Sequence, residues 1–460
     1  MEVQVLSRPQ SNKFMQNYKE YFRGKKVTML GLGLLGRGLN DAKFLADCGA
    51  DLLITDLKTA EQLAPTLKKL AKYKNIKYVL GEHRLEDFKD RDFILKAAGV
   101  PLDSIYITEA RKNNIPIEMD ESLFTKLAPE VKVIGVTGTR GKTTTTYLIY
   151  EVLKQALGER VHLGGNIKGL ATLPLLKKVN PSADGGDVVV MELSSWQLQG
   201  FGEAGISPQI SVFTNLMNDH LNYYKGSMDL YFSDKAKICT NQKAEDFIIC
   251  GQKIAEKIKS CSQKIMAKVS DVPKSWKLKV KGEHNLENIA CAMAVARVLK
   301  IDDKIIKKAV ENFGGVEGRQ EFVKEYKGIK IYNDTTATTP DATIVALKSL
   351  GNPTSLRASR GKNIVLIFGG ADKGLDMAGL LKEIPKYCKK EILLAGTGSE
   401  KLAVLNFIKA DSLGVAVKTA LSFCQKGDIL LFSPAFASFG MFKNEFDRGG
   451  QFVKIIKRLK

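Results

Sequence analysis

The chain has 460 residues, of which 44% are apolar, and a formal net charge of +20. This length predicts two or three domains. No run of about 18 apolar residues is present to span a bilayer, and the first residues lack the apolar core of a signal peptide. We therefore expect a cytoplasmic protein with no membrane association.

Cysteine usage and charge exclude several functional classes. The seven cysteines are scattered without a CxxC pair, which indicates reduced thiols and neither a disulfide framework nor a zinc site. The positive charge would permit nucleic-acid binding, but the lysines are spread along the chain and do not alternate with aromatic residues. We favour a basic surface around sites for anionic small molecules, with no nucleic-acid partner.

The first segment has the pattern of a nucleotide-binding βαβ unit. A strand is expected at Lys26 to Leu30, followed by the glycine turn GLGLLG, a helix, and a second strand from Leu52 to Thr55. This strand leads into Asp56, placed where a Rossmann unit holds a ribose. In isolation the pattern would suggest a nicotinamide-dependent oxidoreductase, yet any unit that brings an anionic nucleotide to a helix N-terminus uses the same geometry.

A phosphate-binding loop is expected in the middle of the chain. The β-branched run from Val131 to Val136 predicts a buried strand, and it is followed by TGTRGKTTTT and a helical pattern. Glycines allow the backbone to approach a phosphate, and a helix N-terminus supplies free N–H groups. The spacing from Gly135 is one residue longer than the strict motif, so a threonine-rich turn in an ordinary βα unit is the competing interpretation. The residues predicted to bind ATP are Gly138, Thr139, Gly141, Lys142, Thr143 and Thr144.

Two later strands also end in polar residues. Glu192 ends an apolar strand beside the predicted loop, where it could bind Mg²⁺ or could be an ordinary solvated glutamate. His220 follows Asp219 at the end of the next strand, and the local sequence leaves a functional histidine and a structural His–Asp pair equally open. Lys235, by itself, reads as a solvated lysine on a helix.

The last segment again alternates strands and helices. Strands are expected at Ile329 to Asn333, Asn363 to Phe368, Ile392 to Ala395 and Ile429 to Phe432, after a glycine-rich hinge that begins at Phe313. Each strand leads into a polar or glycine-bearing turn, and such turns at one edge of a parallel sheet bind ligands.

These patterns predict an α/β protein of three domains. A Rossmann-like domain is expected over residues 1–128, a P-loop ATPase-like domain with a parallel sheet over residues 129–316, and a second Rossmann-like domain over residues 317–460. The glycine hinge favours closure of the last domain over the ATP site.

Seven motifs in chain order resemble one known family. They are TGTRGKTTTT, ELSSWQL, the NDH at residues 218–220, GEHNLEN, Arg319, NDTTATTP and SPAFASFGMFKNEFDRGG. Together they resemble the ATP-dependent Mur ligases of bacterial peptidoglycan synthesis, over nearly the whole chain. The GLGLLG turn with Asp56 and the C-terminal motif look most like the branch that adds D-glutamate to UDP-N-acetylmuramoyl-L-alanine.

The resemblance implies a reaction and roles for individual residues. The γ-phosphate of ATP would pass to the substrate carboxylate, and the amine of D-glutamate would displace phosphate from the acyl phosphate. Lys142, His220 and Lys235 would be catalytic. Thr143 and Glu192 would hold one Mg²⁺, and His220 and a Lys235 carbamylated by CO₂ would serve a second.

The resemblance also implies substrate contacts in all three domains. Asn288, Arg319 and Asp334 would contact ATP, and Asp56 and Asn166 the UDP substrate. Thr338, Lys373, Ser438 and Phe446 would lie where the family holds D-glutamate. The partners implied are these small molecules alone, with the protein acting as a monomer.

Several positions depart from the pattern of the D-glutamate branch. Arg140 replaces an asparagine in the phosphate loop, Leu35 a threonine in the first glycine turn, and Thr336 a lysine. Ala97-Ala98-Gly99 replaces Ser-Pro-Gly, and Phe446 has exchanged places with its acidic neighbour. Because most of these changes cluster around the substrates and not around ATP, they leave ligase chemistry secure and the amino acid less so.

Four alternatives remain open at this point. Another ligase of the family could use a different amino acid, whereas a folylpolyglutamate synthase should lack the first domain. A nicotinamide-dependent oxidoreductase would leave the phosphate loop, Glu192 and His220 unused. A nucleotide-dependent regulator would bind ATP without amino-acid-dependent phosphate release.

Overall fold

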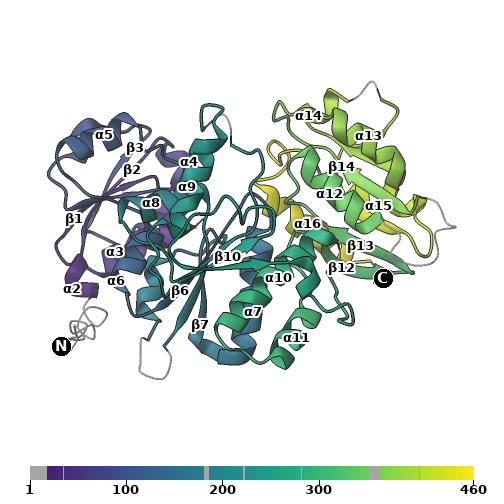
Figure 1. Ribbon diagram of the computed structural model, residues 1–460. Coiled ribbons are helices and arrows are strands. Elements are labelled where there is room, and N and C mark those ends of the chain that lie inside the picture. The colour runs from purple at the N-terminus through teal and green to yellow at the C-terminus, as the bar shows by residue number, and fades with distance from the viewer. Residues whose placement is uncertain are drawn as a thin grey trace, which may run out of the picture. The chain divides into compact units, whose positions relative to one another are not determined.

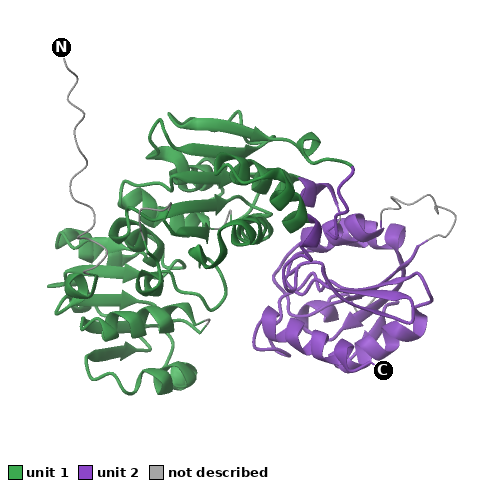
Figure 2. Ribbon diagram, turned by 90° about the horizontal axis from the view of Figure 1, so that it is seen from below, with its two compact units in different colours: residues 1–274, 287–310 green, residues 275–286, 311–460 purple. Residues whose placement is uncertain are grey.

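The computed structural model describes most of the chain and divides it into two compact units. The described residues are 18–34, 36–180, 186–220, 223–280, 282–351, 362–402 and 405–459, so Leu35 lies outside them. Residues 1–274 and 287–310 form the first unit, and residues 275–286 and 311–460 the second (Figure 2). The described residues form three sheets with flanking helices (Figure 1), which confirms the predicted α/β class.

The first sheet has the strand order β3-β2-β1-β4-β5, and all of its pairs are parallel. Its elements are α2 (Tyr18–Phe22), β1 (Lys26–Leu30), α3 (Arg37–Asp47), β2 (Asp51–Asp56), α4 (Ala60–Leu70), β3 (Ile76–Leu80), β4 (Phe93–Lys96), α5 (Ile105–Lys112), β5 (Ile117–Glu118) and α6 (Asp120–Leu127). This is the strand order of a Rossmann unit, in which ligands bind outside the carboxyl ends of the strands.

The second sheet has the order β11-β10-β9-β6-β8-β7 and is also parallel throughout. Its elements are β6 (Lys132–Thr137), α7 (Lys142–Leu157), β7 (Val161–Gly165), β8 (Val188–Glu192), α8 (Ser195–Glu203), β9 (Ile210–Phe213), α9 (Met228–Thr240), β10 (Phe247–Gly251) and β11 (Gln263–Ala267), with α10 (Glu283–Val298) and α11 (Asp303–Asn312) following. Strand β6 lies between β8 and β9, so the loops that follow these three strands meet at one edge.

The third sheet, in the second unit, has the order β12-β13-β17-β14-β15-β16. Its elements are β12 (Glu321–Tyr326), β13 (Ile329–Asn333), α12 (Pro340–Gly351), β14 (Ile364–Phe368), α13 (Ala378–Tyr387), β15 (Cys388–Leu394), α14 (Thr397–Glu400), β16 (Ile408–Ala410), α15 (Leu413–Phe423), β17 (Ile429–Phe432) and α16 (Glu445–Lys457). Strand β12 pairs antiparallel with β13, and the remaining pairs are parallel.

The first and second sheets share one hydrophobic core. Ala128 lies at the predicted linker between them and is fully buried. Its cluster includes Val27 and Leu52 of the first sheet together with Val133 and Val189 of the second. The predicted boundary near residue 128 therefore falls inside continuous packing, because both sheets bury apolar surface against each other.

None of the helices in the described ranges combines the length and the apolar character that crossing a bilayer requires.

The core of the second unit gives a direct stability prediction. Phe432 of β17 stacks on Phe452 of α16 with ring centroids 4.7 Å apart, and both side chains are fully buried. We expect Phe432→Ala to lower the free energy of unfolding of this unit by about 3–5 kcal/mol, because it leaves a cavity in packed apolar surface. Chemical denaturation followed by circular dichroism measures the change.

The matched control is Phe439→Ala, since Phe439 is 66% exposed. Its free energy of unfolding should stay within about 0.5 kcal/mol of the wild-type value. Equal destabilisation by both substitutions would contradict the packing described here.

Candidate active site

The loop between β6 and α7 has a backbone that only glycine fits at two positions. Gly138 has φ 146°, and a Cβ added there would lie 2.0 Å from Oγ1 of Thr214. Gly141 has φ 82°, and a Cβ there would lie 2.3 Å from Oδ1 of Asn288. Thr143 and Thr144 follow in the first turn of α7 and are half-buried. The strand, turn and helix therefore form the anion-binding geometry that the sequence predicted.

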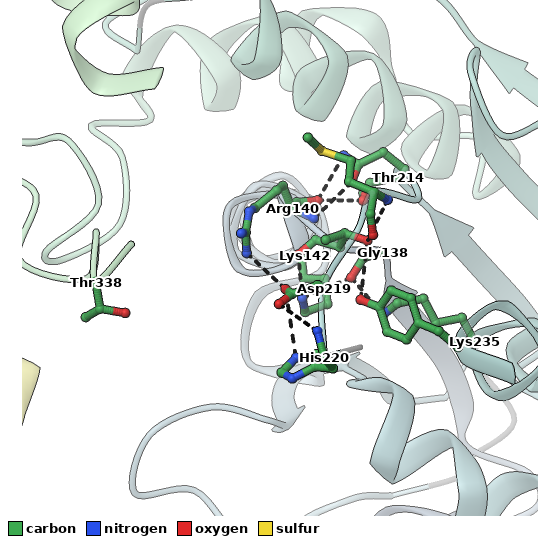
Figure 3. A network of polar contacts seen from close by, with 12 residues as sticks. Gly138, Arg140, Lys142, Thr214, Asp219, His220, Lys235 and Thr338 are labelled. Carbon is green, nitrogen blue, oxygen red and sulfur yellow. Dashed lines mark hydrogen bonds and ion pairs between the residues drawn. The ribbon is translucent and has the colours of Figure 1, made fainter. Parts of the chain in front are cut away.

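Two lysines converge on this loop (Figure 3). Nζ of Lys142 donates to the carbonyl oxygens of Gly138 and Thr139, at 3.0 and 3.1 Å. Nζ of Lys235, which lies on α9, donates to the same Gly138 oxygen at 2.9 Å. One carbonyl thus accepts hydrogen bonds from two lysine side chains of different elements.

Lys235 is buried, contrary to the solvated lysine that its local sequence suggests. Its side chain is 1% exposed, and Nζ lies 4.8 Å from the centre of the Tyr231 ring. Burial holds the pKa of Lys235 well below its usual range, and the positive charge of Lys142 lowers it further. A lowered pKa favours the uncharged amine, which is the nucleophilic form of a lysine.

His220 lies beside these lysines in the loop that follows β9 (Figure 3). Its ring stacks obliquely on Trp196 with centroids 4.8 Å apart, and its backbone has φ 52°, a conformation that non-glycine residues seldom adopt. Burial lowers the pKa of His220, and the charges of Lys142 and Arg140 add to this effect against the opposing effect of Asp219. The neutral imidazole, which can bind a metal, is favoured at neutral pH.

Asp219 pairs with Arg140 and also accepts a hydrogen bond from the backbone N–H of His220 at 3.0 Å. Its Oδ2 lies 3.2 Å from a guanidinium nitrogen of Arg140 but 3.8 Å from Nε2 of His220, which is too far for a hydrogen bond. Asn215 supports the same loop, since its Oδ1 accepts a hydrogen bond from the backbone N–H of Arg140 at 2.9 Å. The Asp219 carboxylate therefore makes no hydrogen bond to the His220 ring, although the two side chains lie within ion-pair distance.

Glu192 ends β8 next to the phosphate loop and is 3% exposed. Its Oε1 accepts a hydrogen bond from Nδ2 of Asn166 at 3.1 Å. Its Oε2 is buried and has no hydrogen-bond partner among the described residues. An unpaired buried carboxylate oxygen is costly, and this one has the hard-oxygen chemistry that Mg²⁺ prefers.

The side chains present fit a magnesium ion that is held mostly by its substrates. Among the described residues, no group of three or more His, Cys, Asp and Glu side chains could hold a metal by itself. Mg²⁺ usually keeps several waters and is bound through one or two carboxylates plus phosphate oxygens. Glu192 with the Thr143 hydroxyl fits this pattern, whereas Lys235 fits it only if its amine is converted to an anionic oxygen donor.

Asn288, predicted to contact ATP, lies in the first unit against the phosphate loop. It is 4% exposed, and its Oδ1 accepts a hydrogen bond from the Thr145 hydroxyl at 3.2 Å. Together with the close approach to Gly141, this contact fixes α10 against the start of α7.

Asp56, predicted to contact the UDP substrate, accepts hydrogen bonds from the glycine turn that follows β1. Its Oδ2 accepts hydrogen bonds from the backbone N–H groups of Leu32 and Gly33, both at 2.9 Å, and its Oδ1 accepts one from Lys58 at 2.9 Å. Burial would raise the pKa of Asp56, but these backbone hydrogen bonds outweigh it and keep the pKa below its usual value. The carboxylate thus shapes the turn that is expected to receive the substrate.

In the second unit, Asp334 is buried at the end of β13. It accepts hydrogen bonds from the Ser433 hydroxyl at 2.7 Å and from the Gln320 N–H at 3.0 Å. Burial raises the pKa of Asp334 to about 7 against the effect of these hydrogen bonds and of the nearby Arg319 charge. Arg319 itself is exposed to solvent.

Three residues predicted to bind the amino acid lie on strand-end loops of the same sheet. Nζ of Lys373 donates to the Thr338 hydroxyl at 2.9 Å, which joins the loops after β14 and β13. A short antiparallel bridge between Ala371 and Ala437 joins the Lys373 loop to the loop that carries Ser438. Phe446 lies in the first turn of α16, where the Asn444 side chain caps its backbone N–H.

Arg448 holds two of these loops together, a role that the sequence did not reveal. Its buried guanidinium donates to the carbonyl oxygens of Thr335, Phe436 and Ala437, at 2.8, 3.2 and 3.2 Å. Burial lowers its pKa to about 10. The signal available in the sequence was an arginine near the end of the C-terminal motif, on the helix that this motif begins.

The sequence also did not reveal the contacts that Arg37 and Tyr231 make. Arg37 directly follows the first glycine turn and reaches the loop of Asn166, whereas Tyr231 lies one helical turn before Lys235 and faces its amine. Both contacts join elements that are far apart in the sequence, so spacing alone could not show them.

Within the first unit, the structure therefore gathers the predicted residues of the phosphate loop with Glu192, His220, Lys235, Asn166 and Asn288. In the second unit it gathers Thr338, Lys373 and Ser438 on joined loops and places Asp334 near Arg319. Asp56 lies apart at the glycine turn of the first sheet.

Comparison with known proteins identifies the family of this chain. The model of the Mur ligase middle domain matches residues 136–273, and that of the Mur ligase glutamate ligase domain matches residues 318–436. Two solved structures from Thermotoga maritima share the fold. They are UDP-N-acetylmuramate-alanine ligase MurC, with a TM-score of 0.57 and 21% identity over 94% of this chain and 99% of that one, and a MurF ligase in complex with ADP, with a TM-score of 0.58 and 18% identity over 97% and 100%.

Curated relatives extend the similarity to almost the full length. A protein of Borreliella afzelii is 37% identical over 94% of this chain and 97% of its own. One of Roseiflexus sp. is 35% identical over 94% and 98%, and one of Clostridioides difficile is 35% identical over 95% and 99%. Each is named UDP-N-acetylmuramoylalanine--D-glutamate ligase. By this similarity, the chain belongs to the Mur ligase family.

Proposed function

We propose that this protein is an ATP-dependent ligase that joins D-glutamate to UDP-N-acetylmuramoyl-L-alanine and releases ADP and phosphate. The observation that carries the proposal is the phosphate loop on which Lys142 and Lys235 converge beside Glu192 and His220. The name of the near full-length relatives supplies the amino acid, and the MurF ligase of the same fold, solved in complex with ADP, supports an adenine nucleotide as a ligand.

The reaction has two steps with different demands on the protein. First, a carboxylate oxygen of the UDP substrate attacks the γ-phosphorus, and the bond to the ADP oxygen breaks. Then the amine of D-glutamate attacks the acyl carbon, loses a proton, and phosphate leaves. Because anionic groups approach one another in the first step, positioning and positive charge supply most of the catalysis.

The residues of the phosphate loop serve the first step. The N–H groups at the start of α7 bind phosphate oxygens, and Lys142 exchanges its carbonyl contacts for the outer phosphates. Glu192 and Thr143 would hold Mg²⁺, which supplies charge neutralisation between the phosphates when it is bound. Asn288 holds α10 against the loop, next to the expected position of the nucleotide.

Carbamylation would give Lys235 its function. The uncharged amine nitrogen attacks the carbon of CO₂ and loses one proton, which leaves an anionic carbamate on the side chain. This change gives the buried side chain an anionic oxygen donor near the neutral imidazole of His220, and such a pair suits a second Mg²⁺. The depressed pKa of Lys235 favours the uncharged amine that this reaction needs.

The three sheets would divide the substrates among them. We assign the UDP substrate to residues 1–128, with Asp56 shaping the glycine turn and Asn166 as a contact from the second sheet. ATP is assigned to residues 129–316 with Arg319 and Asp334, and D-glutamate to residues 317–460. There Lys373 would pair with a carboxylate of the amino acid, beside Thr338, Ser438 and Phe446.

The reaction would take place in the cytoplasm. The seven cysteines are scattered without a CxxC pair, a usage that suits a reducing compartment.

The proposed function is tested by phosphate release from ATP and UDP-N-acetylmuramoyl-L-alanine across a panel of D- and L-amino acids, with mass detection of the product. Only D-glutamate should stimulate release, and the product should be heavier by one glutamyl residue. Stimulation by another amino acid would assign the enzyme to a different branch of the family. No release with any amino acid would reject the ligase.

Removal of the phosphate-loop lysine should slow the chemical step. We expect Lys142→Ala to reduce kcat by about 100-fold or more, because a positive charge at the transferring phosphate is lost. Lys154→Ala is the matched control, since Lys154 lies on the same helix with a side chain that is 41% exposed. Equal activity of the two variants would show that Lys142 does not serve phosphoryl transfer.

The carbamate predicts a chemical rescue. Lys235→Ala should nearly abolish activity, and short-chain carboxylic acids should restore a substantial part of it by supplying the missing oxygen donor. Lys237→Ala, on the same helix, should stay active and gain nothing from the acids. A fully active Lys235→Ala variant would rule out the carbamate.

A further inference from the structure

Arg37 begins α3 and binds the loop that follows β7, which carries Asn166. We propose that Arg37 is a positioning residue that orients the side-chain amide of Asn166 and thereby leaves one oxygen of Glu192 available for Mg²⁺. The proposal rests on the proposed function only in placing Mg²⁺ at Glu192.

The contacts of Arg37 reach three separate elements. One guanidinium nitrogen lies 3.0 Å from Oε1 of Glu121 on α6. The other donates to the carbonyl oxygen of Gly165 at 2.6 Å and to Oδ1 of Asn166 at 3.3 Å. The fixed fork of a guanidinium is well suited to hold three acceptors in one arrangement.

Arg37 also determines which way the Asn166 amide faces. A guanidinium only donates hydrogen bonds, so the amide oxygen of Asn166 must face Arg37. Its Nδ2 then faces Glu192 and donates to Oε1 at 3.1 Å, while the backbone N–H of Asn166 donates to the Glu192 carbonyl at 2.7 Å. A flipped amide would set its oxygen against the carboxylate, where two acceptors repel.

As a result, the two carboxylate oxygens of Glu192 differ in their hydrogen bonding. Oε1 of Glu192 is held by Asn166, and Oε2 is buried without a partner among the described residues. Groups that hydrogen-bond a metal ligand fix its orientation, and their loss commonly lowers metal affinity 10- to 100-fold. Arg37 acts on Glu192 indirectly, through its hydrogen bond to Asn166.

The carboxylate of Glu121, which pairs with Arg37, is itself held in place by a further contact. Glu121 is fully buried, and its Oε1 also accepts a short hydrogen bond from the Gln197 side chain on α8. This arrangement fixes the carboxylate that pairs with Arg37. The first glycine turn, which precedes Arg37 directly, is thus joined to the metal carboxylate through Asn166.

A second side chain of α3 provides a matched control. Nδ2 of Asn40 donates to the carbonyl oxygen of Gly169 at 2.9 Å, further along the loop that carries Asn166. Asn40→Ala therefore loosens the same loop without removing the contact to the Asn166 amide. It separates a general effect on the loop from an effect on amide orientation.

The test measures Mn²⁺ affinity by electron paramagnetic resonance of free Mn²⁺, with a saturating non-hydrolysable ATP analogue. Arg37→Met should weaken Mn²⁺ binding by about tenfold, and Asn40→Ala should leave it unchanged. Asn166→Ala should weaken binding to a similar extent. Adding Arg37→Met to Asn166→Ala should cause no further loss, because the two residues act in series.

Arg37→Met leaves the buried Glu121 without its cation and could unfold the protein. Arg37→Met combined with Glu121→Gln removes both charges, and thermal unfolding checks that this variant is folded. Unchanged Mn²⁺ affinity in the folded variant would overturn the inference, as would additive losses in the Asn166→Ala background. A wild-type protein that binds no Mn²⁺ would overturn both the inference and the metal role of Glu192, whereas the predicted pattern without D-glutamate-dependent activity would reject only the proposed substrate.

Discussion

The site depends on a single electrostatic constraint, namely two lysine side chains that bind one carbonyl oxygen. Lys142 and Lys235 both donate to Gly138, one from the phosphate loop and one from α9. Two cations at this separation repel, and burial makes the charge on Lys235 costly as well. The structure lowers this cost by disfavouring protonation of Lys235, and the same lowering of its pKa makes the amine reactive.

The rest of the first unit keeps the two lysines and the Gly138 carbonyl in this arrangement. The left-handed glycines let the loop approach Thr214 and Asn288 closely, so the Gly138 carbonyl is held in place. Tyr231 covers the Lys235 amine and keeps water from it. The core shared by the first two sheets provides a rigid base, on which Arg37 can transmit a contact from the glycine turn to Glu192. In the second unit, Arg448 plays a comparable part by joining the loops expected to bind the amino acid.

Strands, turns and the family could be predicted because their signals are local. The β-branched run of β6, the glycines after it and the seven motifs all lie within short stretches of sequence. The limits of β15 were less accurate, since this strand begins at Cys388 and not at Ile392. Burial of Lys235, the pairing of Asp219 with Arg140 and the reach of Arg37 depend on residues far apart in the chain. Periodicity and spacing carry no information about such contacts, so the structure was needed to find them.

The most direct test of this account is carbon-13 magnetic resonance of the full-length protein under ¹³CO₂, in the presence of Mg²⁺. The account predicts a carbamate carbonyl resonance in the wild-type protein that is absent from Lys235→Ala and retained in Lys237→Ala, because the proposed reaction joins CO₂ to the buried amine of Lys235. A wild-type spectrum without such a resonance, or one that persists in Lys235→Ala, would contradict it.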